Sequence, residues 1–352
     1  MKAQRIHHWG GPLTLEEVPN PVPGEGEVLI QVEACGIGLS VLNCIRGDLG
    51  HDPGALPRVP GHELVGRIVG VGPGVPDERV GERVCAYFYL FCGRCRWCLA
   101  GSESLCENLA GHVGVDRDGG YAEMTVLPAR NALRLPEPLD PVLATAIPDA
   151  IATPVHVAHR AAIQLGERVV VIAAGGGVGI HMVQVARLHG ADVVGLDRAE
   201  DKLAYLRQQF QVETVNSTDF DGVQLPARWT GQADVIIDLL GRPASLAWAV
   251  TALGTGGRLV LLTTFPGIGF PAAGGSKGLL NATPREMVFR QASILGSRYA
   301  SRWELDRAAR LVASGRIRPV VSRRVGLDEL GAIHESLQQG TLLGRGAVVL
   351  TA

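Results

Sequence analysis

Residues 168–179, RVVVIAAGGGVG, constrain the fold of this chain more than any other segment. An unbroken run of apolar, mostly β-branched residues is typical of a strand buried on both faces of a parallel sheet, and the glycines after it predict a tight turn. Residues 180–188 then follow a helical period. A strand, a glycine turn and a helix in this order predict a doubly wound α/β domain, in which the helix N-terminus binds the pyrophosphate of a dinucleotide.

The turn contains the three small residues that such a site requires, at Ala174, Gly176 and Gly179. Asp197 follows at the end of the next predicted strand, where a carboxylate accepts hydrogen bonds from the adenosine ribose and repels a 2′-phosphate. This predicts NAD rather than NADP, a preference that the adjacent Arg198 weakens. A glycine-rich turn without a ligand is the alternative. The predicted cofactor-binding residues of this segment are Ala174, Gly175, Gly176, Gly177, Val178, Gly179, Asp197 and Arg198.

With 352 residues the chain exceeds a single comfortable core, which favours two domains. Short β-branched runs between glycines and prolines predict an all-β domain over residues 1–150. From residue 151 strands alternate with helical periods, which predicts the dinucleotide-binding domain over residues 151–290. The predicted strands are 27–33, 63–71, 83–87, 168–173, 191–197, 233–239, 257–263 and 346–350, and helices are predicted over 305–313 and 327–337.

The net charge of -2 does not favour binding to nucleic acid or to an anionic membrane. The longest apolar runs are far too short to span a bilayer. Small molecules and copies of the chain itself are the expected partners. The first residues are polar and contain no secretory signal. Six of the seven cysteines lie between Cys44 and Cys106, which favours metal ligation in a reducing compartment over disulfides. A cytoplasmic location follows as a prediction.

Four of these cysteines form the pattern Cys92-x2-Cys95-x2-Cys98-x7-Cys106. Four soft thiolates this close in sequence can surround one zinc ion tetrahedrally, and such a closed shell leaves no place for a substrate. The pattern therefore predicts a structural zinc site. Free or oxidised cysteines are one alternative, and an iron–sulfur cluster is another, although its Cys-Pro signature is absent.

The chain resembles the zinc-type medium-chain alcohol dehydrogenases over essentially its whole length. The resemblance rests on the glycine turn, the four-cysteine pattern, Gly-His62-Glu63-Leu-Val-Gly, and Gly-Gly-Tyr-Ala-Glu at 119–123. The resemblance implies a GroES-like catalytic domain at 1–150 and a Rossmann domain at 151–290, with residues 291–352 returning to the first. It also implies an active site in the interdomain cleft, a homodimer or homotetramer, and an Arg345 that contacts the cofactor pyrophosphate.

The resemblance implies an altered catalytic metal site. Gly38 stands where the family carries a ligand cysteine, Val41 where an aspartate supports the metal-bound histidine, and Asn43 where a relay histidine lies. Four family positions are kept, namely Ser40, His62, Glu63 and Asp149. Zinc lowers the pKa of the alcohol and holds the developing alkoxide, so its weakening matters. A shell of His62, Glu63 and Asp149 with a water could still hold zinc, and Cys44 is a remote substitute ligand.

We therefore expect one tightly held zinc per subunit, with a second partly occupied or missing. The expected activity is NAD(H)-dependent interconversion of an alcohol and an aldehyde or ketone, with Ser40 passing the proton. The alternative is zinc-independent reduction of an activated C=C bond, whose enolate Ser40, Asn43 or His62 could stabilise. A non-enzymatic NAD-binding protein is the second alternative. For single residues, His62 could be a satisfied core histidine, and Asp149 or Ser40 a helix cap.

Overall fold

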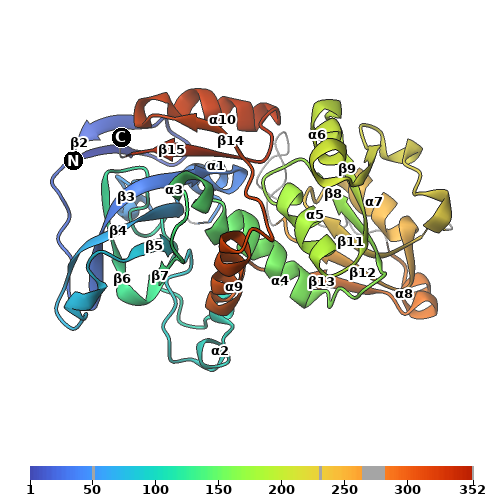
Figure 1. Cartoon of the computed structure of the whole chain (residues 1–352), viewed down its shortest axis with the longest axis horizontal. Helices are drawn as coiled ribbons and strands as arrows, with labels where there is room; N and C mark the ends of the chain where they lie inside the picture. Colours follow the sequence, from blue (N-terminus) through green and yellow to red (C-terminus); the bar gives the residue numbers. More distant parts are fainter. Residues whose placement is uncertain (50–51, 230–231, 264–281, 351–352) are drawn as a thin grey trace. The chain divides into compact units, whose positions relative to one another are not determined.

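The computed structural model describes residues 1–49, 52–229, 232–263 and 282–350, which divide into two compact units. The β unit comprises Met1–Ala152 and Tyr299–Ala352, and the α/β unit comprises Thr153–Arg298 (Figure 1). The sequence predicts divisions near residues 150 and 290. In the structure the chain passes between the units after Ala152 and after Arg298. No helix among the described residues combines the length and the apolar character needed to cross a bilayer.

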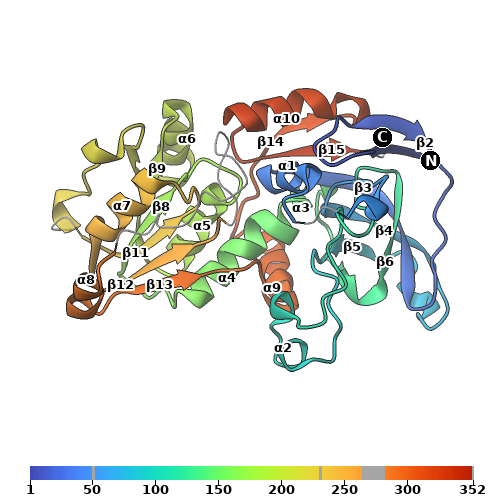
Figure 2. The same cartoon turned by 180° about the vertical axis from the view of Figure 1, so that it is seen from behind.

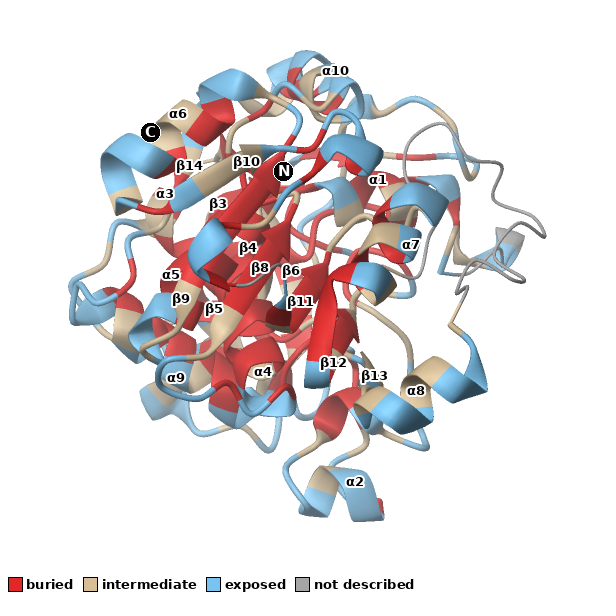
Figure 3. Ribbon diagram, turned by 90° about the vertical axis from the view of Figure 1, so that its right-hand side faces the viewer, coloured by how far each residue is buried: buried red, intermediate tan, exposed pale blue. Residues whose placement is uncertain are grey.

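The β unit is built on a seven-stranded sheet in the order β14-β15-β3-β4-β5-β7, with β6 also paired to β3. Its strands β3 and β4 are mostly buried, as Figure 3 shows, because their apolar side chains form the core of this unit. The strands of the unit are β1 (Lys2–Arg5), β2 (Thr14–Glu17), β3 (Glu27–Ile37), β4 (Glu63–Val71), β5 (Arg83–Ala86), β6 (Met124–Pro128), β7 (Ala132–Arg134), β14 (Val321–Val325) and β15 (Arg345–Val349). The helices are α1 (Leu39–Arg46), α2 (Arg96–Leu99), α3 (Pro141–Ala144), α9 (Arg302–Ala313) and α10 (Leu330–Gln339).

The end of the chain completes the sheet that its beginning starts. β15 pairs antiparallel with β3, and Gly346 lies opposite Ile37. The predicted return of the C-terminal segment to the first domain agrees with this pairing. It also brings Arg345, the first residue of β15, beside the segment that follows β3.

The α/β unit contains a six-stranded sheet in the order β10-β9-β8-β11-β12-β13, in which every pairing is parallel. Numbered along the chain, this is the 3-2-1-4-5-6 order of a Rossmann sheet. The strands are β8 (Arg168–Ile172), β9 (Asp192–Asp197), β10 (Glu213–Asn216), β11 (Ala233–Asp238), β12 (Leu253–Leu261) and β13 (Ser293–Gly296). The helices, which Figure 2 shows around the sheet, are α4 (Ala152–Arg160), α5 (Gly179–Leu188), α6 (Glu200–Phe210), α7 (Pro243–Ala252) and α8 (Pro284–Arg290).

The predicted GroES-like and Rossmann architecture is confirmed, and most predicted strands agree with the structure to within a residue or two. β12 is an exception because it begins at Leu253 rather than at residue 257. Its register against β11 shifts, and Gly256 has a φ of +72°. The glycines therefore form an irregularity inside the strand, whereas the sequence prediction took them as its start. β3 also runs four residues further than predicted, to Ile37.

Candidate functional site

The glycine turn of the α/β unit connects β8 to α5. Ala173 has a φ of +62°, and the backbone N–H of Gly175 donates to Oδ2 of Asp197 over 2.9 Å. A methyl group on Gly179 would lie 2.2 Å from the carbonyl oxygen of Ala173. Only glycine at position 179 therefore allows α5 to begin this close to β8. The turn places the N-terminus of α5 at the carboxyl end of the sheet, where a dinucleotide pyrophosphate would bind.

Asp197 ends β9 with its carboxylate directed at the turn. It is 8% exposed, and its second oxygen, Oδ1, accepts from the N–H of Ala199 over 3.1 Å. Lys202, which was not predicted from the sequence, packs against the same turn. A methyl group on Gly175 would lie 2.5 Å from Cβ of Lys202. Burial lowers the pKa of Lys202, although Asp197 opposes the shift. A lysine inside a charged helix gives no motif that would single it out.

Replacing Gly179 with alanine is expected to destabilise the protein by about 1–3 kcal/mol, because the added methyl group meets backbone rather than a movable side chain. Urea unfolding followed by circular dichroism measures the loss. Gly222→Ala is the matched control, since nothing lies within 4 Å of the position and its change should stay within about 0.5 kcal/mol. Equal stability of the two variants would refute the close approach of α5 to β8.

The four cysteines of the predicted zinc site lie together in the β unit, in the loop that carries α2, which projects from the rest of the unit (Figure 1). The sulfur–sulfur distances are 3.9 Å for Cys92–Cys98, 3.5 Å for Cys95–Cys98 and 4.0 Å for Cys95–Cys106. Four thiolates around one zinc would be about 3.8 Å apart. The N–H groups of Arg94 and Cys95 donate to Cys92, and the first of these bonds lowers the pKa of that thiol to about 6. The donor set fits a tetrahedral zinc.

A second group in the β unit joins His62, Glu63 and Asp149, whose ligand atoms all lie within 4.8 Å of one another. His62 Nε2 is 3.8 Å from Glu63 Oε1 and 3.9 Å from Asp149 Oδ2. Ser40, near the start of α1, brings its Oγ to 3.3 Å from His62 Nε2 and 3.4 Å from Asp149 Oδ2. The ring of Phe88 lies against His62, with centroids 4.5 Å apart. The structure thus brings together four of the five residues that the sequence predicts as catalytic.

Burial and charge shift the protonation of this group. Burial opposes a charge on His62, but the neighbouring Asp149 carboxylate and Cys44 thiol raise its pKa from 6.5 to about 10. Burial raises the pKa of Glu63 from 4.5 to about 7, although Arg345 pulls it down. The raised pKa favours the protonated form of His62, whose Nε2 has Ser40 Oγ as its hydrogen-bond partner at 3.3 Å. His62 is not a core histidine with all its hydrogen bonds formed, because its Nδ1 has no hydrogen-bond partner among the described residues.

Arg345 enters the same group from β15. Its Nη2 lies 2.7 Å from Asp149 Oδ2 and 3.2 Å from Glu63 Oε1, and its side chain is 5% exposed. The guanidinium also fills the space above Gly38. No sequence pattern indicates these contacts, because Arg345 is far along the chain from each partner. The contact with a cofactor pyrophosphate that the family resemblance implies for Arg345 stays a prediction.

The amide oxygen of Asn43 accepts from Arg46, one helical turn further along α1, and the predicted place of Asn43 in the catalytic group stays a prediction. Two helix-cap alternatives need correction. Asp149 is not a helix cap, because it lies inside a π-helical turn, Ile147–Ile151, whose N-cap is Ala146. Ser40 does not cap α1 either, since the N-cap is Gly38.

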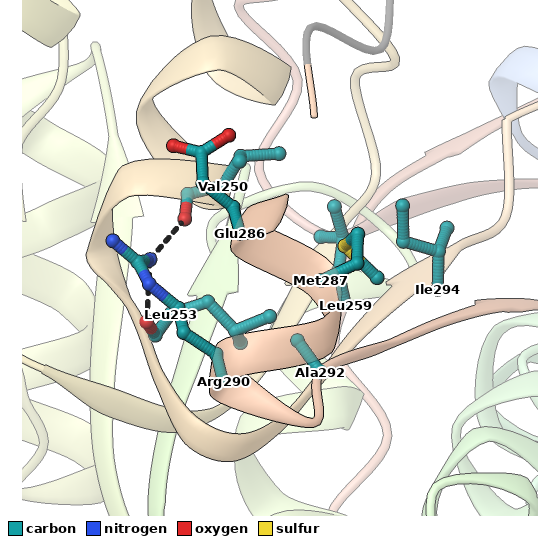
Figure 4. A pocket seen from close by; sticks show the side chains of 8 residues that line it. All are labelled: Val250, Leu253, Leu259, Glu286, Met287, Arg290, Ala292 and Ile294. Atoms are coloured by element: carbon teal, nitrogen blue, oxygen red, sulfur yellow. Dashed lines mark hydrogen bonds between the residues drawn. The ribbon is translucent and has the colours of Figure 1, made fainter. Parts of the chain in front are cut away.

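The α/β unit also contains a small hollow, which is apolar, unlike the groups of polar side chains described above. It lies between α7, α8 and β12, and in Figure 4 the guanidinium of Arg290 closes one side. That group donates to the carbonyl oxygens of Val250 and Leu253 over 2.9 and 3.1 Å. These donors of Arg290 are therefore used within the fold. In the sheet, β8 and β11 lie between β12, which lines the hollow, and β9, which carries Asp197. The hollow therefore lies away from the glycine turn and Asp197.

The chain matches two known families over most of its length. Residues 24–137 match the family described as "Alcohol dehydrogenase GroES-like domain" and residues 177–314 that described as "Zinc-binding dehydrogenase". An alcohol dehydrogenase of Geobacillus stearothermophilus is 31% identical over 346 residues, which cover 98% of each chain. An acryloyl-coenzyme A reductase of Metallosphaera sedula is 30% identical, over 96% of each chain. The crystal structure of an NAD-dependent alcohol dehydrogenase superposes with a TM-score of 0.87 at 32% identity, over the full length of both chains.

The protein is therefore a two-domain oxidoreductase of the medium-chain type. It belongs to the zinc-type medium-chain dehydrogenase/reductase family, that of the alcohol dehydrogenases. This confirms the family predicted from the sequence.

Proposed function

We propose that the chain catalyses the reversible oxidation of an alcohol to an aldehyde or ketone with NAD. A hydride passes from the alcohol carbon to the nicotinamide, and the hydroxyl proton leaves through the protein. The observation that carries this proposal is the contact of Ser40 Oγ with both His62 Nε2 and Asp149 Oδ2. A hydroxyl held between a histidine and a carboxylate can take up a proton and pass it on within hydrogen-bond distance.

NAD is the proposed cofactor because of the position of Asp197. Its carboxylate ends β9 beside the glycine turn, where it would accept hydrogen bonds from the adenosine ribose. Gly177, Val178 and Gly179 would present backbone N–H groups to the pyrophosphate. The N–H groups of Ala174, Gly175 and Gly176 are used within the fold, where they shape the turn. Lys202, packed against Gly175, offers a further donor to the ribose. Arg198 remains a predicted contact.

Replacing Asp197 with alanine is expected to reduce the preference for NADH over NADPH about tenfold, because one charge-assisted hydrogen bond and one repulsive charge are lost. Fluorescence titration of both cofactors measures the ratio of dissociation constants. Asp192→Ala, at the other end of β9, is the control: its exposed pair with Arg228 is lost but the turn is untouched. An unchanged ratio in the Asp197 variant would rule out the ribose assignment.

A structural zinc at the four cysteines forms part of the proposal, supported by the sulfur–sulfur distances of 3.5–4.0 Å. Bound there, zinc would hold the loop together and would supply no chemistry, because four thiolates fill its coordination shell. The use of thiolates as ligands also supports the proposed cytoplasmic location, since they persist in a reducing compartment. We propose a homodimer or homotetramer from the family resemblance.

Reduction of an activated C=C bond is the second candidate. It is favoured by the altered position 38, where Gly38 replaces a metal ligand, and by the similarity to a relative named acryloyl-coenzyme A reductase. Conjugate hydride addition spreads its charge into an enolate, which hydrogen bonds from Ser40 and His62 would stabilise.

A screen of primary and secondary alcohols, ketones and enones, read by NADH absorbance, separates the two candidates. Turnover of alcohols and ketones is the expected result. Turnover confined to enones would establish the second candidate instead. Absence of NADH binding by the purified protein would overturn both.

A further inference from the structure

Gly38 and the guanidinium of Arg345 share one place in the β unit. β15 runs antiparallel to β3 with Gly346 opposite Ile37, so Arg345 begins its strand beside Gly38. A methyl group added to Gly38 would lie 1.4 Å from Nη1 and 2.4 Å from Cζ of Arg345. No side chain at position 38 is compatible with this placement. A ligand cysteine at this position and Arg345 in this conformation therefore exclude each other.

The guanidinium contacts the same carboxylate oxygens that face the histidine. Arg345 Nη2 lies 2.7 Å from Asp149 Oδ2 and 3.2 Å from Glu63 Oε1. These are also the two oxygens that lie 3.9 Å and 3.8 Å from His62 Nε2. A zinc ion held by His62, Glu63 and Asp149 would thus have to bind atoms that already have a cation beside them.

Because this ion pair is buried, another cation cannot easily replace Arg345 in it. The side chains of Arg345 and Glu63 are 5% and 0% exposed, so water cannot replace the ion pair without unpacking the strand. Buried carboxylates need a compensating cation. The guanidinium supplies it through a hydrogen bond to Asp149 and through its charge beside Glu63, whose oxygens have no hydrogen-bond partner among the described residues. The separations from His62 Nε2 also exceed the spacing of about 3.4 Å between nitrogen and oxygen ligands of a tetrahedral zinc. The residues of this group do not fit zinc while Arg345 lies among them.

We propose that Arg345 replaces the catalytic zinc of the family: its guanidinium is the resident cation of the His62–Glu63–Asp149 group, and Gly38 provides the space for it. Arg345 is then a positioning residue. It holds Asp149, the carboxylate to which Ser40 donates, by a charge that is part of the chain and does not dissociate. Its part in catalysis rests on the proposed function, whereas its exclusion of a second metal does not.

Metal counting tests the proposal without reference to activity. The purified protein is saturated with zinc, dialysed, and analysed by mass spectrometry for zinc per chain. It is then titrated with Co²⁺, whose tetrahedral sites absorb in the visible and, with a thiolate ligand, show a sulfur charge-transfer band. We expect one zinc per wild-type chain and no further Co²⁺. The double variant Gly38→Cys/Arg345→Leu should gain one Co²⁺ with the sulfur band.

Two controls separate the guanidinium from the cysteine. Gly38→Cys alone should gain no Co²⁺, because the guanidinium of Arg345 must move aside for the cysteine but its charge still lies beside the Asp149 and Glu63 carboxylates. Gly38→Cys combined with Arg324→Leu, an arginine of β14 whose side chain is about half exposed, should behave like Gly38→Cys alone. Two zinc ions per wild-type chain, Co²⁺ binding by Gly38→Cys alone, or a folded double variant that gains nothing would each overturn the proposal. If the double variant does not fold, the wild-type stoichiometry and the single variant still decide. A failed substrate screen would contradict the proposed function and leave these counts unaffected.

Discussion

Replacing Cys95 with serine is expected to remove the zinc from the four-cysteine loop and to unfold that loop. The loop has little core of its own: α2 is four residues long, and Leu99 and Trp97 are 76% and 36% exposed. Its order must then come from metal ligation, which contributes on the order of 10 kcal/mol in small zinc-dependent folds. Losing one of four thiolates should reduce bound zinc from one equivalent to a small fraction.

Limited trypsin digestion measures directly whether the loop is folded. Arg94 and Arg96 are exposed but lie in an ordered turn, so the wild-type chain should resist cleavage there and the Cys95 variant should be cut rapidly. Cys85→Ala is the matched control, because Cys85 is a fully buried thiol of β5 outside the loop. It should keep its zinc and its resistance. A Cys95 variant that retains full zinc and is not cleaved would contradict a structural zinc at this site.

Replacing Ser40 with alanine is expected to lower kcat about a hundredfold while leaving the dissociation constant of NADH unchanged. The physical reason is the loss of a hydroxyl that lies within hydrogen-bond distance of both His62 Nε2 and Asp149 Oδ2. General acid–base groups contribute factors of about 10²–10⁴. Stopped-flow or steady-state assays on the best alcohol or ketone from the screen, with NADH binding measured by fluorescence, separate the two effects.

Ser40→Thr keeps the hydroxyl and should restore most of the rate. Ser336→Ala, whose hydroxyl donates to the carbonyl oxygen of Ala332 on the surface of α10, should leave kcat unchanged. A Ser40→Ala variant with wild-type kcat would show that the proton leaves by another route. An equal loss in Ser40→Thr would point to packing rather than to the hydroxyl.

Features that reside in a short stretch of sequence could be predicted. The glycine turn at 174–179 requires a particular backbone path, and that requirement is visible in the residues themselves. The four cysteines lie within 15 residues of one another, so their spacing alone brings the sulfurs together. Alternation of strands and helices predicted the doubly wound parallel sheet, because each unit of strand and helix must pack on its neighbour.

Features that depend on the direction of a side chain could not be predicted from the sequence. No sequence pattern indicated that the amide oxygen of Asn43 would accept from Arg46, one turn further along α1. Asp149 could be a cap or a ligand by its position near Pro148, and only the π-helical turn directs it at Ser40 and His62. The start of β12 was misplaced because glycines interrupt a strand as readily as they begin one.

By itself, the sequence determined the family, the two folds, the dinucleotide turn and the four-cysteine loop, since each is encoded by residues that are neighbours along the chain. The occupant of the catalytic metal position was decided by the tertiary structure alone. The sequence showed a missing ligand at Gly38 and an arginine near the end of the chain as unrelated facts. Pairing of β15 with β3 places them together, and two atoms cannot fill the same volume, so the guanidinium of Arg345 takes the space that a cysteine would need.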